Sequence, residues 1–167
     1  MTRYGSAWLC LAVAFSCEGA DNGYGKINIS GVVVDAPCSI SPGADNIQVN
    51  FGDVSASALQ NGHESAAVDF SLDLLRCSTS LKNRVRVTFQ GTAFPDGLFS
   101  VGQGNTTVGI AVRDRFGQQV FNNQPVAWQR INNGDNQLRF SSVLKGRAAV
   151  VSSGSFQTQV LFTVEYL

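Results

Sequence analysis

Apolar or β-branched side chains occupy every second position of the stretch Phe156-Gln-Thr-Gln-Val-Leu-Phe-Thr-Val-Glu-Tyr166, close to the C-terminus. Successive side chains of a β-strand point to opposite faces, so this period of two predicts a strand with one buried face. A half-buried strand needs a sheet, and the sheet needs a second layer to cover its apolar face. The stretch therefore decides the fold class in favour of layered β-structure.

The same period recurs in three earlier stretches, residues 68–74, 84–89 and 108–112. No window longer than ten residues shows a helical period, although Ser55 to Leu59 can form one short turn. Turn signals rich in Gly, Asn, Pro and Ser separate the stretches: Ser41-Pro-Gly43, Gln60-Asn-Gly62, Pro95-Asp-Gly97, Asn132-Asn-Gly134 and Ser152-Ser-Gly154. Short strands divided by frequent turns predict an all-β sandwich.

The composition fits one domain of this kind. The chain has 167 residues, of which 44% are hydrophobic, and this is enough to build a core. Twelve basic residues balance twelve acidic ones, so no global field would hold nucleic acid or an anionic membrane. We therefore expect no nucleic-acid partner.

Residues 1–20 are predicted to be an export signal. Arg3 provides a positive charge, and the apolar run from Ala7 to Phe15 is too short to span a bilayer as a helix. Small residues follow, so cleavage can fall after Ser16, Gly19 or Ala20, and the site stays open between 16 and 20. An acylated Cys17, as in a lipoprotein, is a weaker alternative because Ala14 stands where a Leu is usual.

Two of the four cysteines, Cys38 and Cys77, lie beyond this leader. An exported chain meets an oxidising compartment, which favours a disulfide between them. A metal pair would need further ligands that the single histidine, His63, cannot supply. Closing a loop of this length should contribute about 4 kcal/mol in the chain-entropy model.

Catalytic patterns are missing from the sequence. His63 lies in the polar loop Gln60-Asn-Gly-His-Glu64, where a solvated surface histidine is expected, and there is no G-x-S-x-G motif. The glycines of Gly102-Gln-Gly104 precede a predicted strand and not a phosphate-binding helix. We therefore expect no enzymatic activity, no cofactor, no metal ion and no small-molecule substrate.

Two segments are hard to explain as ordinary sandwich strands. The apolar run Lys26-Ile-Asn-Ile-Ser-Gly-Val-Val-Val34 precedes the domain, and the last strand ends the chain without a polar tail. Five further short motifs follow along the chain: Ala36-Pro-Cys-Ser-Ile40, Phe51-Gly52, Leu72-Asp-Leu-Leu75, Thr88-Phe-Gln-Gly91 and Val108-Gly-Ile-Ala111. In this order, the set resembles the pilin subunits of the chaperone–usher pathway, of the type 1 and P-pilus kind. Gly154 is fourteenth from the terminus and Tyr166 is penultimate, as in that family, whereas Leu167 stands where a polar residue is frequent.

This resemblance implies an incomplete immunoglobulin-like β-sandwich that lacks its last strand and is completed by a donor strand. Residues 21–35 would be the N-terminal donor-strand extension, and residues 36–167 the pilin domain. The implied donor side chains share one parity of the extension and are Ile27, Ile29, Gly31 and Val33. Burying two Ile and one Val side chain could contribute roughly 5–9 kcal/mol.

The resemblance also implies partners. A periplasmic chaperone would bind along the last strand, and an outer-membrane usher and neighbouring pilin subunits would follow. The implied chaperone contacts are Gly154, Phe156, Thr158, Val160, Phe162, Val164, Tyr166 and the carboxylate of Leu167. The expected function is that of a structural pilus subunit supporting cell adhesion, exported through the periplasm to the cell-surface fimbrium.

A second interpretation is a small secreted carbohydrate-binding sandwich with Trp128, Tyr24 or Phe121 as a stacking platform. The alternation around Trp128 favours a place in the core instead. Residues 26–34 could also be the ordinary first strand of a complete sandwich. Whether the chain is a main shaft subunit, an adaptor or a terminator stays open, as do its host and any receptor.

Overall fold

The structure, a computed structural model, describes residues 36–167, which are almost entirely strands and connecting loops. The strands are β1 (Ser39–Ile40), β2 (Val68–Cys77), β3 (Arg84–Gln90), β4 (Phe99–Ser100), β5 (Val108–Asp114), β6 (Gln119–Val120), β7 (Gln129–Arg130), β8 (Gly134–Gly146) and β9 (Leu161–Tyr166). Two short 3-10 helices, η1 (Ala44–Asn46) and η2 (Ala56–Gly62), lie before β2. No helix among residues 36–167 is long and apolar enough to cross a membrane.

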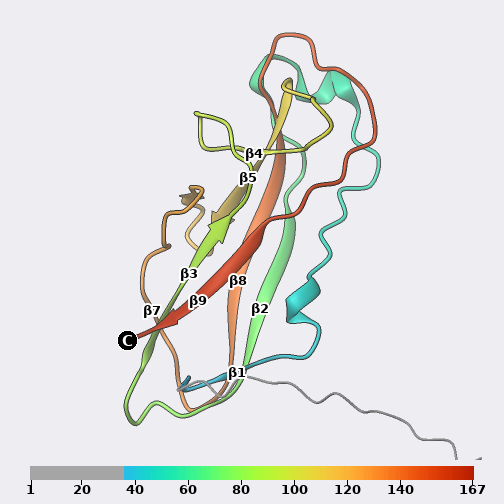
Figure 1. The fold of residues 1–167 in the computed structure, drawn as a ribbon. Coiled ribbons are helices and arrows are strands. Elements are labelled where there is room, and N and C mark those ends of the chain that lie inside the picture. The colour runs from blue at the N-terminus through green and yellow to red at the C-terminus, as the bar shows by residue number, and fades with distance from the viewer. Residues whose placement is uncertain (1–35) are drawn as a thin grey trace, which may run out of the picture. The chain divides into compact units, whose positions relative to one another are not determined.

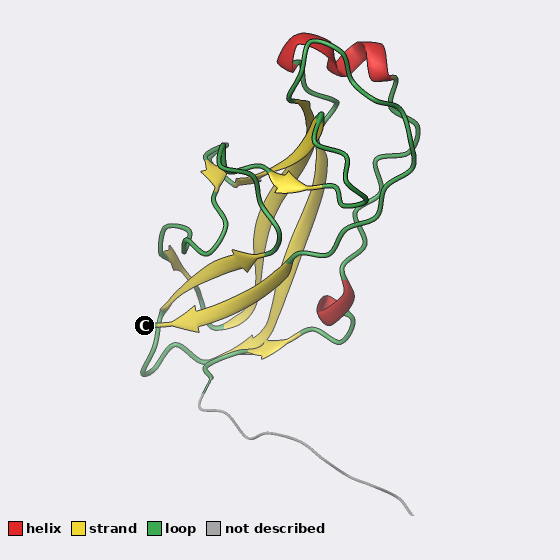
Figure 2. Cartoon of the chain, turned by 45° about the horizontal axis from the view of Figure 1, so that its top comes forward, coloured by secondary structure: helices red, strands yellow, loops and turns green. Residues whose placement is uncertain are grey.

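The strands form two antiparallel sheets. The larger has the order β1-β2-β8-β5-β4, with β6 also paired to β5, and the smaller has the order β7-β3-β9. Figures 1 and 2 show β3 and β9 side by side, with β2 and β8 in the other layer. The described part is thus the sandwich that the sequence predicts.

The core lies between the two sheets. Val85 and Val87 of β3 are fully buried, and the ring of Phe89 meets that of Phe140 on β8 edge-on, with 5.0 Å between centroids. Phe70 of β2 stacks on the same Phe140 ring at 5.6 Å. Alternating residues of β2 and β3 therefore supply the core, because only one face of each strand meets the other layer.

The predicted disulfide is present between Cys38 and Cys77. Cys77 is the last residue of β2, and Cys38 directly precedes β1, which pairs with β2 only through Ser39 and Ile40. Both residues of β1 are exposed. The covalent bond therefore holds a short edge strand that little packing would otherwise fix.

The last strand is shorter than the sequence predicts. Regular pairing begins at Leu161, which lies opposite Gln90, the final residue of β3. β3 ends at Gln90, and residues 154–160 are not paired to a strand on that side. Phe156, like the other even-numbered residues up to Tyr166, is nevertheless partly buried, and the odd-numbered ones are exposed.

The simple alternation does not predict the longest strand, β8, because Val143 is buried on its outer face beside Ala111. The expectation that Trp128 lies in the core is wrong. Trp128 is half-buried and not in the core, since β7 is an edge strand and the Arg86 guanidinium covers the indole ring at 4.5 Å.

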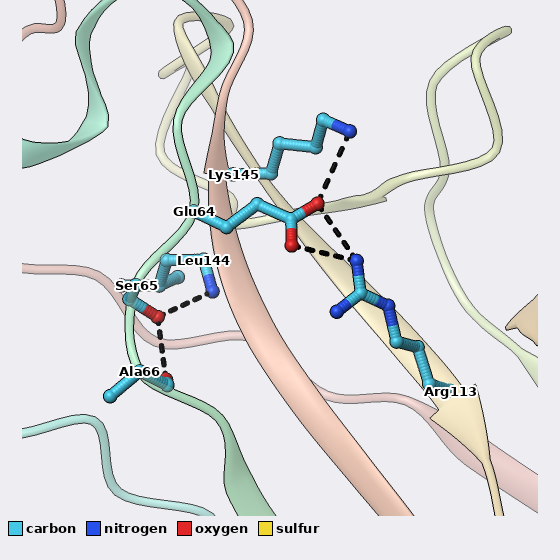
Figure 3. A network of polar contacts seen from close by, with 6 residues as sticks. All are labelled: Glu64, Ser65, Ala66, Arg113, Leu144 and Lys145. Atoms are coloured by element: carbon cyan, nitrogen blue, oxygen red, sulfur yellow. Dashed lines mark hydrogen bonds and ion pairs between the residues drawn. The ribbon is translucent and has the colours of Figure 1, made fainter. Parts of the chain in front are cut away.

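A polar network fixes the chain just before β2 against the larger sheet (Figure 3). The Glu64 carboxylate accepts two hydrogen bonds from Arg113 Nη2, at 2.8 and 2.7 Å, and pairs with Lys145 Nζ at 3.2 Å. Next to it, the Ser65 hydroxyl accepts a hydrogen bond from the Leu144 N–H at 3.0 Å. These contacts hold the segment after η2 beside β8.

Partial burial alone would raise the pKa of the Glu64 carboxyl, but the hydrogen bonds from Arg113 and Lys145 outweigh it and lower the pKa below 4.5. A lowered folded pKa stabilises the fold above the unfolded pKa, and this contribution is lost as the pH falls through the folded value. We expect Glu64→Gln to lower the free energy of unfolding by about 1 kcal/mol at pH 7, because the pair is partly exposed. Urea denaturation at pH 7 and pH 3 checks this, since the difference from wild type should shrink as the pH falls through the lowered pKa of Glu64.

Glu165→Gln is the matched control, because Glu165 has one cationic partner, Arg86, and is more exposed. Its effect at pH 7 should be smaller. If Glu64→Gln were equally destabilised at both pH values, the contribution of Glu64 to stability would come from its packing and not from its charge.

Candidate functional site

A groove lies between residues 48–54 and residues 151–157, two segments that run along the same side of the sandwich (Figure 1). Its volume is about 740 Å³. Phe51 and Phe156 face each other from its two sides, with 6.3 Å between ring centroids. The apolar residues along it are Val49, Phe51, Val54, Ala56, Leu59, Val101, Val108, Leu144, Val151 and Phe156.

Both long edges of this groove are short of main-chain partners. In the described structure, no hydrogen bond joins the main chain of residues 47–54 or 153–159 to another segment. Neither stretch forms a strand, although main-chain N–H and C=O groups beside a core ordinarily find hydrogen-bond partners. The groove therefore has the properties of a sheet from which one strand is missing.

The side chains of β9 show the same incompleteness. Val85 and Val87 of β3 are fully buried, whereas their partners in register, Tyr166 and Val164, are only partly buried. Both pairs point into the sandwich. The difference in burial arises because β3 is paired on both sides, with β7 and β9, whereas β9 is paired on one side only.

The C-terminus is fixed to the start of β3. The Leu167 N–H donates to the Arg84 carbonyl oxygen at 2.9 Å, and a terminal oxygen of Leu167 accepts from the Asn83 and Arg84 N–H groups at 3.0 and 2.9 Å. The Tyr166 hydroxyl is buried without a hydrogen-bond partner in the described part, and burial raises the pKa of this phenol. The end of β9 is thus held in place by main-chain bonds.

The structure brings some of the predicted site residues together and leaves others untested. Ile27, Ile29, Gly31 and Val33 lie outside the described residues. The partly buried residues predicted to contact a chaperone follow the groove and its continuation along β9, and they are Phe156, Thr158, Val160, Phe162, Val164 and Tyr166. Gly154 lines the groove, and Leu167 directly follows the last residue of β9.

Sequence reasoning missed the opposite edge of the groove. Only the Phe51-Gly52 motif pointed to residues 48–54, because this segment has no strand partner and no sustained alternation. The groove end formed by η2 was also missed, although Leu59 is almost completely buried there. No part of residues 36–167 gathers three or more His, Cys, Asp or Glu side chains into a metal-binding group, and His63 is exposed.

Comparison with known proteins gives the family of this fold. The profile of the family described as fimbrial protein matches residues 27–167. The chain belongs to the fimbrial protein family. This pilin is 35% identical to the Fimbria A protein of Serratia marcescens over 163 residues, covering 95% of the chain and 93% of the relative. It is 32% identical to the Major MR/P fimbria protein of Proteus mirabilis, covering 92% and 90%.

Solved structures agree with the fold of the pilin. The rod subunit PapA of the P pilus superimposes with a TM-score of 0.71 at 26% identity, over 79% of this chain and all of that one. A subunit from a chaperone–usher pilus gives 0.75 at 27% identity, over 90% and 100%. The incomplete immunoglobulin-like sandwich is therefore confirmed.

The pilin is a structural subunit of a surface fimbrium, and its relatives are structural subunits and not enzymes. The interpretation as a stand-alone carbohydrate-binding sandwich is wrong as an account of the whole chain. Of its three suggested platform residues, Trp128 is covered by Arg86, Phe121 packs beside Gly97, and Tyr24 lies outside the described residues.

Proposed function

We propose that this pilin polymerises by donor-strand exchange, in which the N-terminal extension of a neighbouring subunit fills the groove beside β9. The observation that carries the proposal is that, within residues 36–167, the main chains of 47–54 and 153–159 have no hydrogen-bonded neighbouring segment. A strand placed between them would bond to both and would cover the half-buried face of β9.

The sequence of the extension matches this groove. Ile27, Ile29 and Val33 share one parity of an extended strand and would face the apolar lining together. Gly31 lies between them, where a glycine weakens a strand and supplies no packing. Such a glycine is expected where the opposite surface leaves no room for a side chain.

Delivery to the polymer needs a protein that protects the open groove first. We assign this step to a periplasmic chaperone bound along β9, followed by transfer at an outer-membrane usher and growth at the cell surface. A groove whose main-chain edges have no partner within residues 36–167 would otherwise pair with any available strand.

Mixing chaperone complexes of two forms of the pilin tests the exchange. One form is complete, and the other lacks residues 21–35 and can only accept a strand. Denaturant-resistant pairs should form between the two forms and not among copies of the shortened one. Pairs formed by the shortened form alone, or none in the mixture, would contradict the proposal.

The C-terminal strand is predicted to be the chaperone contact. Deleting Val164 to Leu167 should abolish co-purification with the chaperone, because it removes half of β9 and the bonds to Arg84. Two single changes separate contact from folding: Val164→Ala on the inner face should reduce recovery of the complex several-fold. Thr163→Ala, on the exposed face, should leave it unchanged. Equal recovery of all three variants would count against the assignment.

A further inference from the structure

The end of η2 contains a chemically reactive pair of residues, Asn61 and Gly62. Asparagine is one of the labile residues of proteins, and it reacts most readily before a glycine, because no side chain shields the main-chain nitrogen that follows. The described residues contain two such pairs, Asn61-Gly62 and Asn133-Gly134. Both asparagines are exposed, so access to water does not distinguish them.

The two pairs differ in how the asparagine side chain is held. Asn133 Oδ1 accepts hydrogen bonds from the Thr79 N–H at 2.8 Å and from the Thr79 hydroxyl at 2.9 Å. Gly134 begins β8 and is paired with Cys77. The Asn61 side chain, in contrast, has no hydrogen-bond partner within residues 36–167. The side-chain amide of Asn61 can therefore rotate without breaking a hydrogen bond, whereas that of Asn133 cannot.

The main chain at Asn61 leaves room for a reaction between the two residues. Asn61 has a positive φ of 56° and a non-helical conformation within η2, and Gly62 has a positive φ of 80°. Among the described residues, a β-carbon at Gly62 would meet only the Gly146 carbonyl oxygen, 3.9 Å away. The space beside this peptide bond is thus open, so the Gly62 nitrogen can approach the Asn61 side chain in the geometry that ring closure needs.

We propose that Asn61 is a site of spontaneous covalent modification. The Gly62 nitrogen loses its proton to hydroxide and attacks the side-chain carbonyl carbon of Asn61, and the side-chain nitrogen leaves as ammonia. Water then opens the resulting succinimide ring. Opening at the main-chain carbonyl gives isoaspartate, in which the chain runs through the former side chain, and opening at the side-chain carbonyl gives aspartate. Water is the one co-reactant consumed, and no oxidant or reductant takes part.

An isoaspartate would no longer fit the two hydrogen bonds that hold this turn. The Asn61 N–H donates to the Ala148 carbonyl oxygen at 3.2 Å, and the Gly146 N–H donates to the His63 carbonyl oxygen at 3.0 Å. These bonds lie on either side of the modified peptide bond, and isoaspartate lengthens the main chain between them by a carbon atom. Leu59, which is buried and lines the groove, belongs to the same helix. The modification should therefore loosen the end of the groove that η2 forms.

Peptide mapping of assembled filaments kept at mildly alkaline pH tests the site. Isoaspartate is identified by mass spectrometry after methylation with an isoaspartate-specific methyltransferase. Conversion should be at least about ten-fold faster at position 61 than at position 133, because two hydrogen bonds hold the Asn133 side chain. In chains that are reduced and unfolded in urea, the two positions should convert at similar rates, since both asparagines then precede an equally accessible glycine.

Asn61→Gln is the matched variant, because a longer amide side chain closes the corresponding ring far more slowly. It should give no product at position 61 and leave conversion at position 133 unchanged. Thr79→Ala removes one hydrogen bond to Asn133 and should speed conversion there several-fold. Equal rates at the two positions of the folded chain, or no product at position 61 while the unfolded chain converts, would overturn the proposal.

The consequence for the groove rests on the proposed donor-strand exchange and has its own readout. Chaperone complexes of wild type and of Asn61→Gln are aged under the same conditions and then allowed to form denaturant-resistant pairs. Aged wild type should pair several-fold less than aged Asn61→Gln, and equal pairing would overturn the link between the modification and the groove. Absence of pairs before ageing would contradict the exchange itself, so the two failures are distinguishable.

Discussion

Replacing Gly146 with alanine is expected to destabilise this pilin by about 3 kcal/mol or more, with loss of the groove end formed by η2. A β-carbon at this position would overlap the carbonyl oxygen of Leu59 and would lie 2.8 Å from its carbonyl carbon. Both are main-chain atoms, so η2 would have to move as a whole. Urea denaturation of the disulfide-intact chain gives the loss of stability.

The contact matters for function because Leu59 lines the groove. η2 lies beside the segment after β8 in Figures 1 and 2, and the Asn61 N–H donates to the Ala148 carbonyl oxygen at 3.2 Å. Gly117→Ala is the control, since a β-carbon at Gly117 would meet open space. Its only cost is the strain of an alanine at the positive φ of 77°. That strain should cost about 1–2 kcal/mol. A Gly146→Ala variant no less stable than this control would show that η2 does not depend on the close approach.

Replacing Gly31 with leucine is expected to block insertion of the extension into the next groove while leaving the subunit itself intact. A side chain at the glycine position would clash with the acceptor, an overpacking penalty of about 1–3 kcal/mol or more. Formation of denaturant-resistant pairs from chaperone complexes measures the effect. The same variant should bind the chaperone like wild type if, as proposed, the extension is not part of the subunit's own sandwich.

Ser30→Leu is the matched control for this prediction, since its side chain has the opposite parity and should face away from the groove. Failure of Gly31→Leu at the chaperone stage would place residues 27–34 in the subunit's own sandwich. Pairing as efficient as wild type would mean that the proposed donor register is wrong.

Much of this fold could be predicted where one face of a strand is buried. Alternation located β2 and β3 closely, and it located the part of the last strand from Leu161 onward. It failed for β8, whose Val143 is buried on the outer face, because a strand covered on both sides loses its period of two. It also extended β9 too far, since side-chain parity continues through Phe156 although no strand lies beside that residue.

The groove could be predicted only in part. Its β9 side carries a periodic signal, whereas residues 48–54 form the other edge without strand pairing and so leave no regular pattern in the sequence. The approach of Leu59 to Gly146 joins residues far apart in the chain, and local patterns contain no information about such contacts.

Backbone hydrogen exchange along the two edges of the groove tests the central claim most directly. The sample is the disulfide-intact pilin without residues 21–35, measured before and after addition of a peptide of residues 26–35. The account predicts that amides within 47–54 and 153–159 exchange rapidly at first and slow by on the order of 100-fold or more once the peptide is bound. Amides of β2 and β8 should change far less. Unchanged exchange along either edge, with the peptide bound, would contradict the account, because the inserted strand would then not complete the sheet.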